Sequence, residues 1–383
     1  MTRRLTTLLA VIAVCTGALG LTSSAHAARG MEVAMQDDAT FLLGLRNPFK
    51  GLDKAAALHT TYIRTNVVWN SVVNGASSKK KPKHLKYKWR AYDDLIQRAG
   101  ERGMAVEMTL TVPAPRWATG GKKKNGIYKP NAKLFGQFTH DAAAHFTPLG
   151  VKRYSVGNEA NLRLWLAPLK SAPKLYRGLY IAAYGAIKGV DSSNQVLIGE
   201  TAPYSTPGRT MAPLEFLRGV TCVNARYKSP SCKGLKTDGY AHHPYDYKHK
   251  PTYKYPGKDN VTLATISRLT KALSKLHSSK ALTTPSGGTP EVYLTEYGYF
   301  AGANYKLPQK TQAKYLVQGF TMAQKNKHVR QMLQYLLVPP QPGKGDFFAT
   351  QIMNTKFKPL KAYTALKKWA DKLAPGGGIA TSP

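Results

Sequence analysis

Short apolar runs alternate with amphipathic segments along this chain. Eight runs are rich in β-branched and aromatic residues and are bounded by turn formers, the pattern typical of strands: residues 32–35, 62–69, 105–111, 153–156, 195–199, 239–242, 292–295 and 331–337. Between several of them, apolar residues recur at the spacing of one helix face, in residues 92–102, 175–189, 261–277, 311–325 and 359–373. This alternation of strands and helices predicts a parallel sheet.

The number of strand–helix units decides the fold class. Eight units without a glycine-rich dinucleotide fingerprint favour an α/β fold with a single (β/α)8 TIM barrel over residues 28–373. An open, doubly wound sheet is the alternative. Residues 374–383, which include three consecutive glycines, are expected to form a flexible tail. In a barrel, chemistry is found where the strands end at their carboxyl side.

The first 27 residues have the organisation of a secretion signal. Arg3 and Arg4 precede an uncharged apolar run over residues 5–21, and the small-x-small pattern of residues 25–27 follows. We therefore predict a signal peptide at 1–27 and an extracellular location. No stretch reaches the ~20 apolar residues of a membrane span, so no span is expected.

Removal of the signal would leave two cysteines, Cys222 and Cys232. Nine residues rich in turn formers separate them. In an oxidising compartment this spacing predicts a disulfide that closes a loop, with a metal-binding pair or two free thiols as alternatives. Closing so short a loop contributes about 2–3 kcal/mol in the chain-entropy model.

Four of the eight glutamates lie at the end of a predicted strand or on a strand other than the first strand. Glu159 follows the fourth strand and Glu296 ends the seventh. A carboxylate at the point where an apolar strand opens into a loop is partly desolvated, which raises its pKa. Two such groups across a barrel mouth supply the acid/base and the nucleophile of glycoside cleavage. Glu200, at the end of the fifth strand, is the rival, and Glu107, within the third, is expected to join a buried ion pair.

These strand ends resemble those of the clan A glycoside hydrolases, families 5 and 39 above all. The resemblance begins with Asn158-Glu159 and with Thr295-Glu296-Tyr297-Gly298. It extends to residues 62–69, with Arg64, to the Pro-rich segment 112–118, to His243-Pro244-Tyr245 and to Lys358-Pro359 before the last helix, so that it spans roughly residues 31–372. Each motif is weak alone, but all occur in the same order.

The resemblance implies a role for each matching residue. Glu159 would be the general acid and then the base, and Glu296 would be the nucleophile. Arg64 would lower the pKa of Glu296 by its charge, and Tyr245 would donate a hydrogen bond to it. Asn158 would bind the sugar 2-hydroxyl, and His243 would support the site. A separation of ~5–5.5 Å between the two carboxylates would give retention of configuration. The clan requires neither a metal nor a cofactor; Arg64 as a purely structural cation, and a core or metal-binding His243, remain alternatives.

The sugar platform departs from the family pattern. Many family 5 relatives carry a tryptophan on the eighth strand, where this chain has Leu333 and Gln334. Trp117 and Trp165, which follow the third and fourth strands, are the expected substrate-stacking residues. Trp69, Tyr204 and Tyr299 also fall near strand ends, and packing in the upper core is the alternative for all five.

The charge of the chain is the feature least typical of such enzymes. Lys+Arg number 56 against 20 Asp+Glu, a net charge of +36, and basic residues crowd segments 79–88, 122–124 and 248–258 near predicted strand ends. Cations around a barrel mouth would concentrate an anionic glycan. A solvated basic surface is the alternative, and without a recognition module no specific nucleic-acid partner is expected.

Together these features predict a secreted, monomeric, retaining glycoside hydrolase that cleaves β-linkages in a polysaccharide or oligosaccharide. A catalytically silent barrel that binds glycan or cell wall is the second hypothesis. A transglycosylase that uses the same site is the third. The pattern of residues does not choose among sugars.

Overall fold

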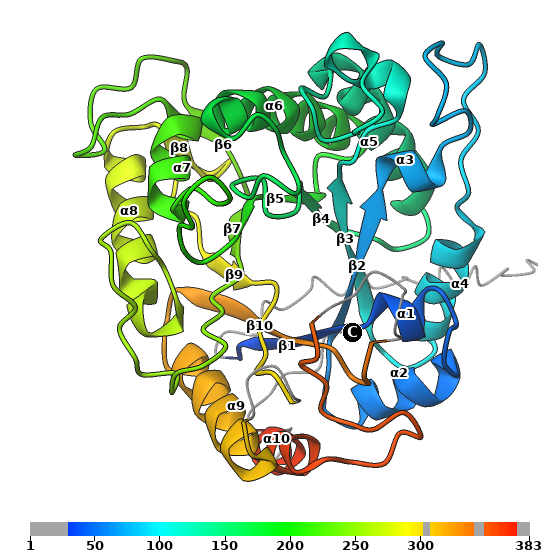
Figure 1. Cartoon of the computed structure of the whole chain (residues 1–383), viewed down its shortest axis with the longest axis vertical. Helices are drawn as coiled ribbons and strands as arrows, with labels where there is room; N and C mark the ends of the chain where they lie inside the picture. Colours follow the sequence, from blue (N-terminus) through cyan, green and yellow to red (C-terminus); the bar gives the residue numbers. More distant parts are fainter. Residues whose placement is uncertain (1–29, 302–306, 341–347, 374–383) are drawn as a thin grey trace, which may run out of the picture.

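The computed structural model describes residues 30–301, 307–340 and 348–373. Eight parallel strands close into a barrel in the order β1-β10-β9-β7-β5-β4-β3-β2 (Figure 1). These strands are β1 (Glu32–Gln36), β2 (Tyr62–Val68), β3 (Ala105–Thr111), β4 (Arg153–Val156), β5 (Gln195–Thr201), β7 (Gly239–His242), β9 (Val292–Leu294) and β10 (Val329–Tyr335). All eight predicted strands are confirmed, and the open sheet is excluded. The predicted signal peptide and tail lie outside the described residues.

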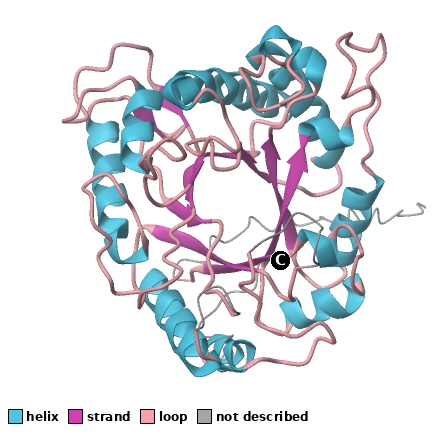
Figure 2. Cartoon of the chain, viewed as in Figure 1, coloured by secondary structure: helices cyan, strands magenta, loops and turns pink. Residues whose placement is uncertain are grey.

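Helices surround the barrel on its outside (Figure 2). They are α1 (Asp38–Phe41), α2 (Pro48–Ala56), α3 (Trp69–Val72), α4 (Arg90–Gly100), α5 (Ala132–Phe146), α6 (Ala172–Val190), α7 (Pro213–Thr221), α8 (Ile266–Ser278), α9 (Gln309–Gln324) and α10 (Lys361–Asp371). The five predicted helices correspond to α4, α6, α8, α9 and α10. The short strands β6 (Leu235–Lys236) and β8 (Leu282–Thr283) pair outside the barrel.

Helix α5 was not among the predicted helices, although its local signals are clear. The side chain of Asn131 accepts a hydrogen bond from the Leu134 N–H at 3.0 Å, which caps the first turn. Phe135, Phe138 and Phe146 are buried along one face. The helix packs against α6, which in turn contacts β4 and β5.

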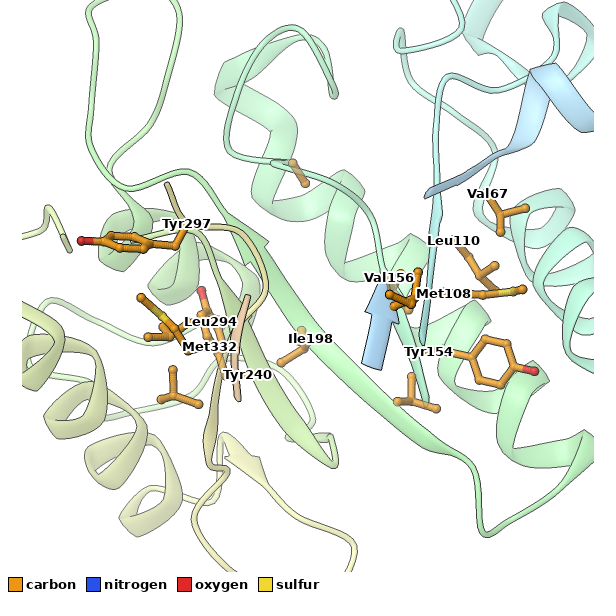
Figure 3. Packing of buried hydrophobic residues seen from close by; sticks show 14 of the residues in the cluster. Val67, Met108, Leu110, Tyr154, Val156, Ile198, Tyr240, Leu294, Tyr297 and Met332 are labelled. Atoms are coloured by element: carbon orange, nitrogen blue, oxygen red, sulfur yellow. The ribbon is translucent and has the colours of Figure 1, made fainter. Parts of the chain in front are cut away.

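The hydrophobic core lies between the strands and the helices. Along β2, β3 and β4, every second side chain is apolar and faces the helices, as Val67, Met108, Leu110 and Tyr154 do in Figure 3. This alternation follows from the two-residue period of a strand. It leaves the other half of the strand positions to fill the inside of the barrel.

The inside of this barrel is largely polar. Among the described residues, the apolar cluster inside it is small and consists of Leu197, Ala241 and Tyr293. Near the amino ends of the strands, Arg153 binds Glu32 at 2.7 Å and Glu107 at 3.3 Å. Glu107 is therefore a member of a buried ion pair, as predicted. A second ionic cluster occupies the opposite, carboxyl end.

Two further expectations are settled by the described residues. Cys222 and Cys232 form a disulfide, which joins the end of α7 to the loop before β6. Among the helices described, none is both long and apolar enough to cross a membrane.

Candidate active site

The two predicted catalytic glutamates leave different strands at the same end of the barrel. Glu159 lies three residues beyond β4, and Glu296 two residues beyond β9. The turn after β4 takes Gly157 to φ 77° and Glu159 to φ 40°. A left-handed backbone is costly for a residue with a side chain, so the surrounding hydrogen bonds must hold it in place. One of them runs from the Glu159 N–H to the Glu200 carbonyl at 2.7 Å.

Arg64, on β2, reaches across the barrel to the nucleophile position. Its Nη1 donates to Glu296 Oε1 at 2.8 Å and its Nη2 to Asn158 Oδ1 at 2.9 Å. The guanidinium is 1% exposed and is also bound by Gln36 and by Thr109. Arg64 therefore couples the predicted nucleophile to the predicted sugar-binding amide.

Tyr245 contacts Glu296 directly, and Asn158 is joined to it through Arg64. Tyr245 donates from its hydroxyl to Glu296 Oε2 at 3.2 Å, so each oxygen of Glu296 has a donor. Asn158 is buried, its carbonyl oxygen occupied by Arg64. The described residues supply no partner for its amide nitrogen, which can act as a donor to a ligand.

His243 lies close to both predicted catalytic carboxylates. Its Nδ1 lies 3.0 Å from Glu159 Oε1 and 3.6 Å from Glu296 Oε2. Because both oxygens are close to one atom, they can be no more than about 6.6 Å apart (3.0 plus 3.6 Å), a bound that accommodates the ~5–5.5 Å of retaining glycosidases. The neighbouring His242 is instead a core residue, with ring nitrogens 2.9 Å from Thr201 Oγ1 and from the Val261 carbonyl.

Glu200 is more deeply buried than Glu159 and Glu296. It was the rival catalytic carboxylate, but its side chain is completely buried beneath the site. Register shifts between Gly199 and Thr201 mark a bulge in β5, and Glu200 has φ 47°. A bulge redirects a side chain, here into the barrel. Glu200 cannot contact a substrate from this position.

From there Glu200 connects both cations of the site. One of its oxygens, Oε2, lies 2.7 Å from His243 Nε2 and 3.2 Å from Arg64 Nη2. Further donors are hydroxyl groups of Thr295, at 2.6 Å, and of Ser155 and Thr109. Glu200 thus fixes the positions of the two side chains that contact Glu296 and Glu159.

These contacts set the charge states of the buried groups. Burial alone would raise the pKa of Glu200, but Arg64, His243 and the hydroxyl donors lower it to about 2. Burial would lower the pKa of His243, whereas Glu296, Glu159 and Glu200 raise it to about 10. At neutral pH Glu200 is therefore an anion and His243 a cation.

The pKa of Glu296 differs from the sequence-based expectation. Burial raises it, and although His243 and Arg64 both act to lower it, the net shift is upward. Arg64 and His243 place two positive charges next to Glu296, and Glu200 balances one of them.

The predicted stacking residues have different fates. Trp69 and Tyr299 are at most 1% exposed, which makes them core residues. Trp117 is 7% exposed and packs edge-on against Trp69 at 5.7 Å. Trp165 is half-buried in the same loop as Glu159 and stays the predicted platform. Gln334 is buried and donates to backbone carbonyls of the loop after β10, so it does not replace the missing tryptophan.

Solved structures of glycoside hydrolases are similar to this barrel. A family 39 glycoside hydrolase from the gut symbiont Bacteroides cellulosilyticus WH2 aligns with a TM-score of 0.59 at 15% identity, over 90% of this chain and 64% of that one. A monomeric β-xylosidase from Caulobacter crescentus CB15 gives 0.56 at 16% identity, over 88% and 67%. The chain has the fold of these glycoside hydrolases.

A third structure covers more of the relative. It is a family 5, subfamily 18 glycoside hydrolase from Streptomyces cattleya, solved in complex with GlcNAc, with a TM-score of 0.61, 14% identity and 92% of this chain against 82% of that one. Neither a protein-family model nor a curated protein sequence matches the chain. The identities are low, so the likeness concerns the fold, and the chemistry must be argued from the site.

Proposed function

We propose that the protein is a retaining glycoside hydrolase that uses Glu296 as nucleophile and Glu159 as acid/base. The observation that supports this most directly is the convergence of both carboxylates on one nitrogen of His243. The upper bound of about 6.6 Å on their separation lies at the lowest end of the ~6.5–9.5 Å that an inverting enzyme needs for its water, so the arrangement favours retention.

In the first step, a Glu296 oxygen attacks the anomeric carbon while the bond to the leaving oxygen breaks. Glu159 transfers its proton to that oxygen, and Glu296 becomes a neutral ester. Arg64 and Tyr245, which bind the two Glu296 oxygens, hold the attacking carboxylate in one orientation. The Asn158 amide nitrogen is the donor for the sugar 2-hydroxyl.

In the second step, water replaces the ester. Glu159, now ionised, removes a proton from the water as its oxygen bonds to the anomeric carbon, and the bond to Glu296 breaks. The two inversions together retain configuration. His243 stabilises Glu159 when it is ionised, because a cation next to a developing anion lowers the free energy of that state.

The finer parts of the proposal concern substrate and location. We infer that the sugar linkage is β, as the resemblance to families 5 and 39 implies. The signal-like residues 1–27 support export and an extracellular substrate. An anionic glycan accords with the basic loops. The protein would act as a monomer.

The test is hydrolysis of a panel of aryl β-glycosides, uronides included, by the parent protein and by Glu296→Ala. Activity that collapses in the variant supports the proposal and names the sugar bound at the cleavage site. Product configuration, followed by NMR, must match that of the substrate. Transfer of the sugar to added alcohols or oligosaccharides in preference to water would indicate a transglycosylase.

Two outcomes contradict the proposal. Activity that survives in Glu296→Ala would exclude this nucleophile. Binding of glycans by a parent protein that hydrolyses no substrate would instead support the silent barrel. An inverted product would leave the two carboxylates in place but exclude double displacement.

A further inference from the structure

The loops that follow β2 and β3 carry cations without any acid. Residues 69–89 and 112–131, here called the loop 2/3 surface, hold eleven basic residues and no Asp or Glu. Ten are exposed and Arg116 is half-buried. They are Lys79, Lys80, Lys81, Lys83, Lys86, Lys88, Arg116, Lys122, Lys123, Lys124 and Lys129. Within the described part of the chain, none of them has an ion-pair partner among the salt bridges found.

The two loops form one continuous surface. The Arg116 N–H donates to the Ala76 carbonyl at 2.7 Å, and the Asn70 N–H to the Pro113 carbonyl at 2.9 Å. Lys81 lies 5.9 Å from the centre of the Trp117 ring. Like charges gathered in this way repel one another, and an anionic ligand relieves that repulsion.

A second basic surface follows β7. Residues 243–262, here called loop 6, alternate tyrosines with lysines, and both acids in the segment are already engaged. Asp246 accepts from the Lys248 and His249 backbone N–H groups and from the His249 ring. Asp259 is bound by both terminal nitrogens of Arg218 at 2.7 Å. Lys248, Lys250 and Lys254 are exposed, and no carboxylate within the described residues forms an ion pair with them.

Loop 6 also presents aromatic faces. Tyr253 is 37% exposed and stacks on His249 with ring centres 3.9 Å apart. Tyr255 stacks on Tyr204, from the loop after β5, at 4.5 Å. Aromatic rings that alternate with cations suit a polymer whose units have both a flat apolar face and a negative charge. A chain of uronic acid sugars has both.

The order of the strands places the two surfaces on opposite sides of the mouth. In the closed barrel, β2 and β7 are separated by the same number of strands in either direction. Glu159 follows β4, which lies between them on one side, and Glu296 follows β9, which lies between them on the other. A polymer that touches both surfaces therefore crosses the line from one catalytic carboxylate to the other.

We propose that the substrate is an anionic polysaccharide, a β-linked polyuronate, that lies across the barrel mouth from the loop 2/3 surface to loop 6 and is cleaved internally. This inference rests on the proposed function and adds the substrate class and the mode of attack. Cations on both sides of the cleavage point bind the chain on both sides of the broken bond. A surface on one side alone would fit release of terminal sugars.

The experiment compares two triple variants that lose the same charge. Lys248→Gln, Lys250→Gln and Lys254→Gln alter loop 6. The control changes Lys228, Lys325 and Lys327 to Gln; all three are exposed and precede β7 or β10 at the opposite end of the barrel. Binding to polyglucuronate and to polymannuronate is measured by affinity electrophoresis at low and high salt, with hydroxyethyl cellulose as the neutral polymer.

The loop 6 variant is expected to bind both polyuronates about tenfold more weakly at low salt, since each exposed ion pair is weak but three are lost together. The control variant should bind as the parent does. High salt should weaken parental binding, because exposed charges are screened. Equal losses in the two variants, or equal binding of the neutral polymer, would overturn the proposal.

Cleavage tests the internal mode of attack. Viscosity of a polyuronate solution should fall well before many reducing ends appear, whereas early release of single sugars would exclude a chain that lies across the mouth. If a DNA oligonucleotide of equal charge density displaces the bound polyuronate, the ligand of these surfaces is nucleic acid instead. If polyuronate binding depends on loop 6 but the protein cleaves no glycoside, the proposed binding surface is supported and the proposed hydrolysis is wrong.

Discussion

Two buried arginine–carboxylate clusters occupy the two ends of this barrel, and they differ in one respect that decides their roles. Arg64 binds Glu296 and Glu200 at the carboxyl end, and Arg153 binds Glu32 and Glu107 at the amino end. Glu200 and Glu107 are both buried next to an arginine. Yet the pKa of Glu200 falls to about 2, whereas burial raises the pKa of Glu107 despite Arg153.

The number of donors explains the difference. Both oxygens of Glu200 accept hydrogen bonds, from two cations and three hydroxyl groups. Glu107 Oε2 accepts from Arg153 and Gln331, but its Oε1 has no hydrogen-bond partner within the part of the chain that the structure describes. Burial of a carboxylate is therefore not enough to tell its charge state; the donors around it decide. The cluster at the carboxyl end stays charged and contacts Glu159 and Glu296. The cluster at the amino end holds the strands together.

The largest effect is expected for Glu159, which lies next to the cluster at the carboxyl end of the barrel. Glu159→Ala should lower kcat by about 10²–10⁴ on substrates with poor leaving groups, because general acid catalysis contributes that much. Aryl glycosides with good leaving groups need little protonation, so their first step should be nearly preserved. Steady-state rates across a leaving-group series measure this. Equal loss on all members would exclude the acid role.

At the amino end of the barrel, Arg153→Met should lower the free energy of unfolding and leave catalytic activity unchanged. It removes the only cation bound to Glu32 and Glu107 among the described ion pairs, and an uncompensated buried charge costs about 3–5 kcal/mol. Urea unfolding at neutral pH measures the loss, which should shrink at low pH as the carboxylates take up protons. A folded variant with normal stability but no activity would reverse the roles assigned to the clusters.

Glu200→Gln tests whether Glu200 sets the charge of His243. Without this anion the pKa of His243 falls, so the imidazolium is lost at a lower pH. The alkaline limb of kcat/KM should therefore move to lower pH by about one unit, whereas activity at neutral pH is kept because His243 still carries its proton there.

A purely structural role for Glu200 would lower the amount of folded protein without moving that limb. Circular dichroism and the unfolding midpoint keep the two outcomes apart. The stability that ionised Glu200 contributes is fully present above its ordinary unfolded pKa and is lost as the pH falls toward about 2.

The smallest effect is expected for Glu107→Gln. Since burial raises the pKa of Glu107 in the folded state, its ionised form contributes little at neutral pH, and the amide keeps an acceptor for Arg153. Unfolding free energy should change by less than about 1 kcal/mol, well below the change in Arg153→Met. A loss as large as that of Arg153→Met would remove the distinction drawn between Glu107 and Glu200.

Local sequence patterns were enough for the eight strands, for five of the helices and for the ends of the strands. The strands were found because each is a short apolar run between turn formers, and Glu159 and Glu296 because each follows such a run. The disulfide followed from two cysteines close together in a turn-rich segment. These properties depend on neighbours in the sequence, which is why they could be predicted.

What the tertiary structure decided was set by contacts between distant residues. The bulge in β5 turned Glu200 from a rival catalyst into a buried anion, and the upper core covered Trp69 and Tyr299. The net pKa of Glu296 depends on burial balanced against Arg64 and His243, which are 232 and 53 residues away in the chain. The sequence alone determined which residues stand at the barrel mouth; barrel closure determined which of them meet, because charge and burial act through space.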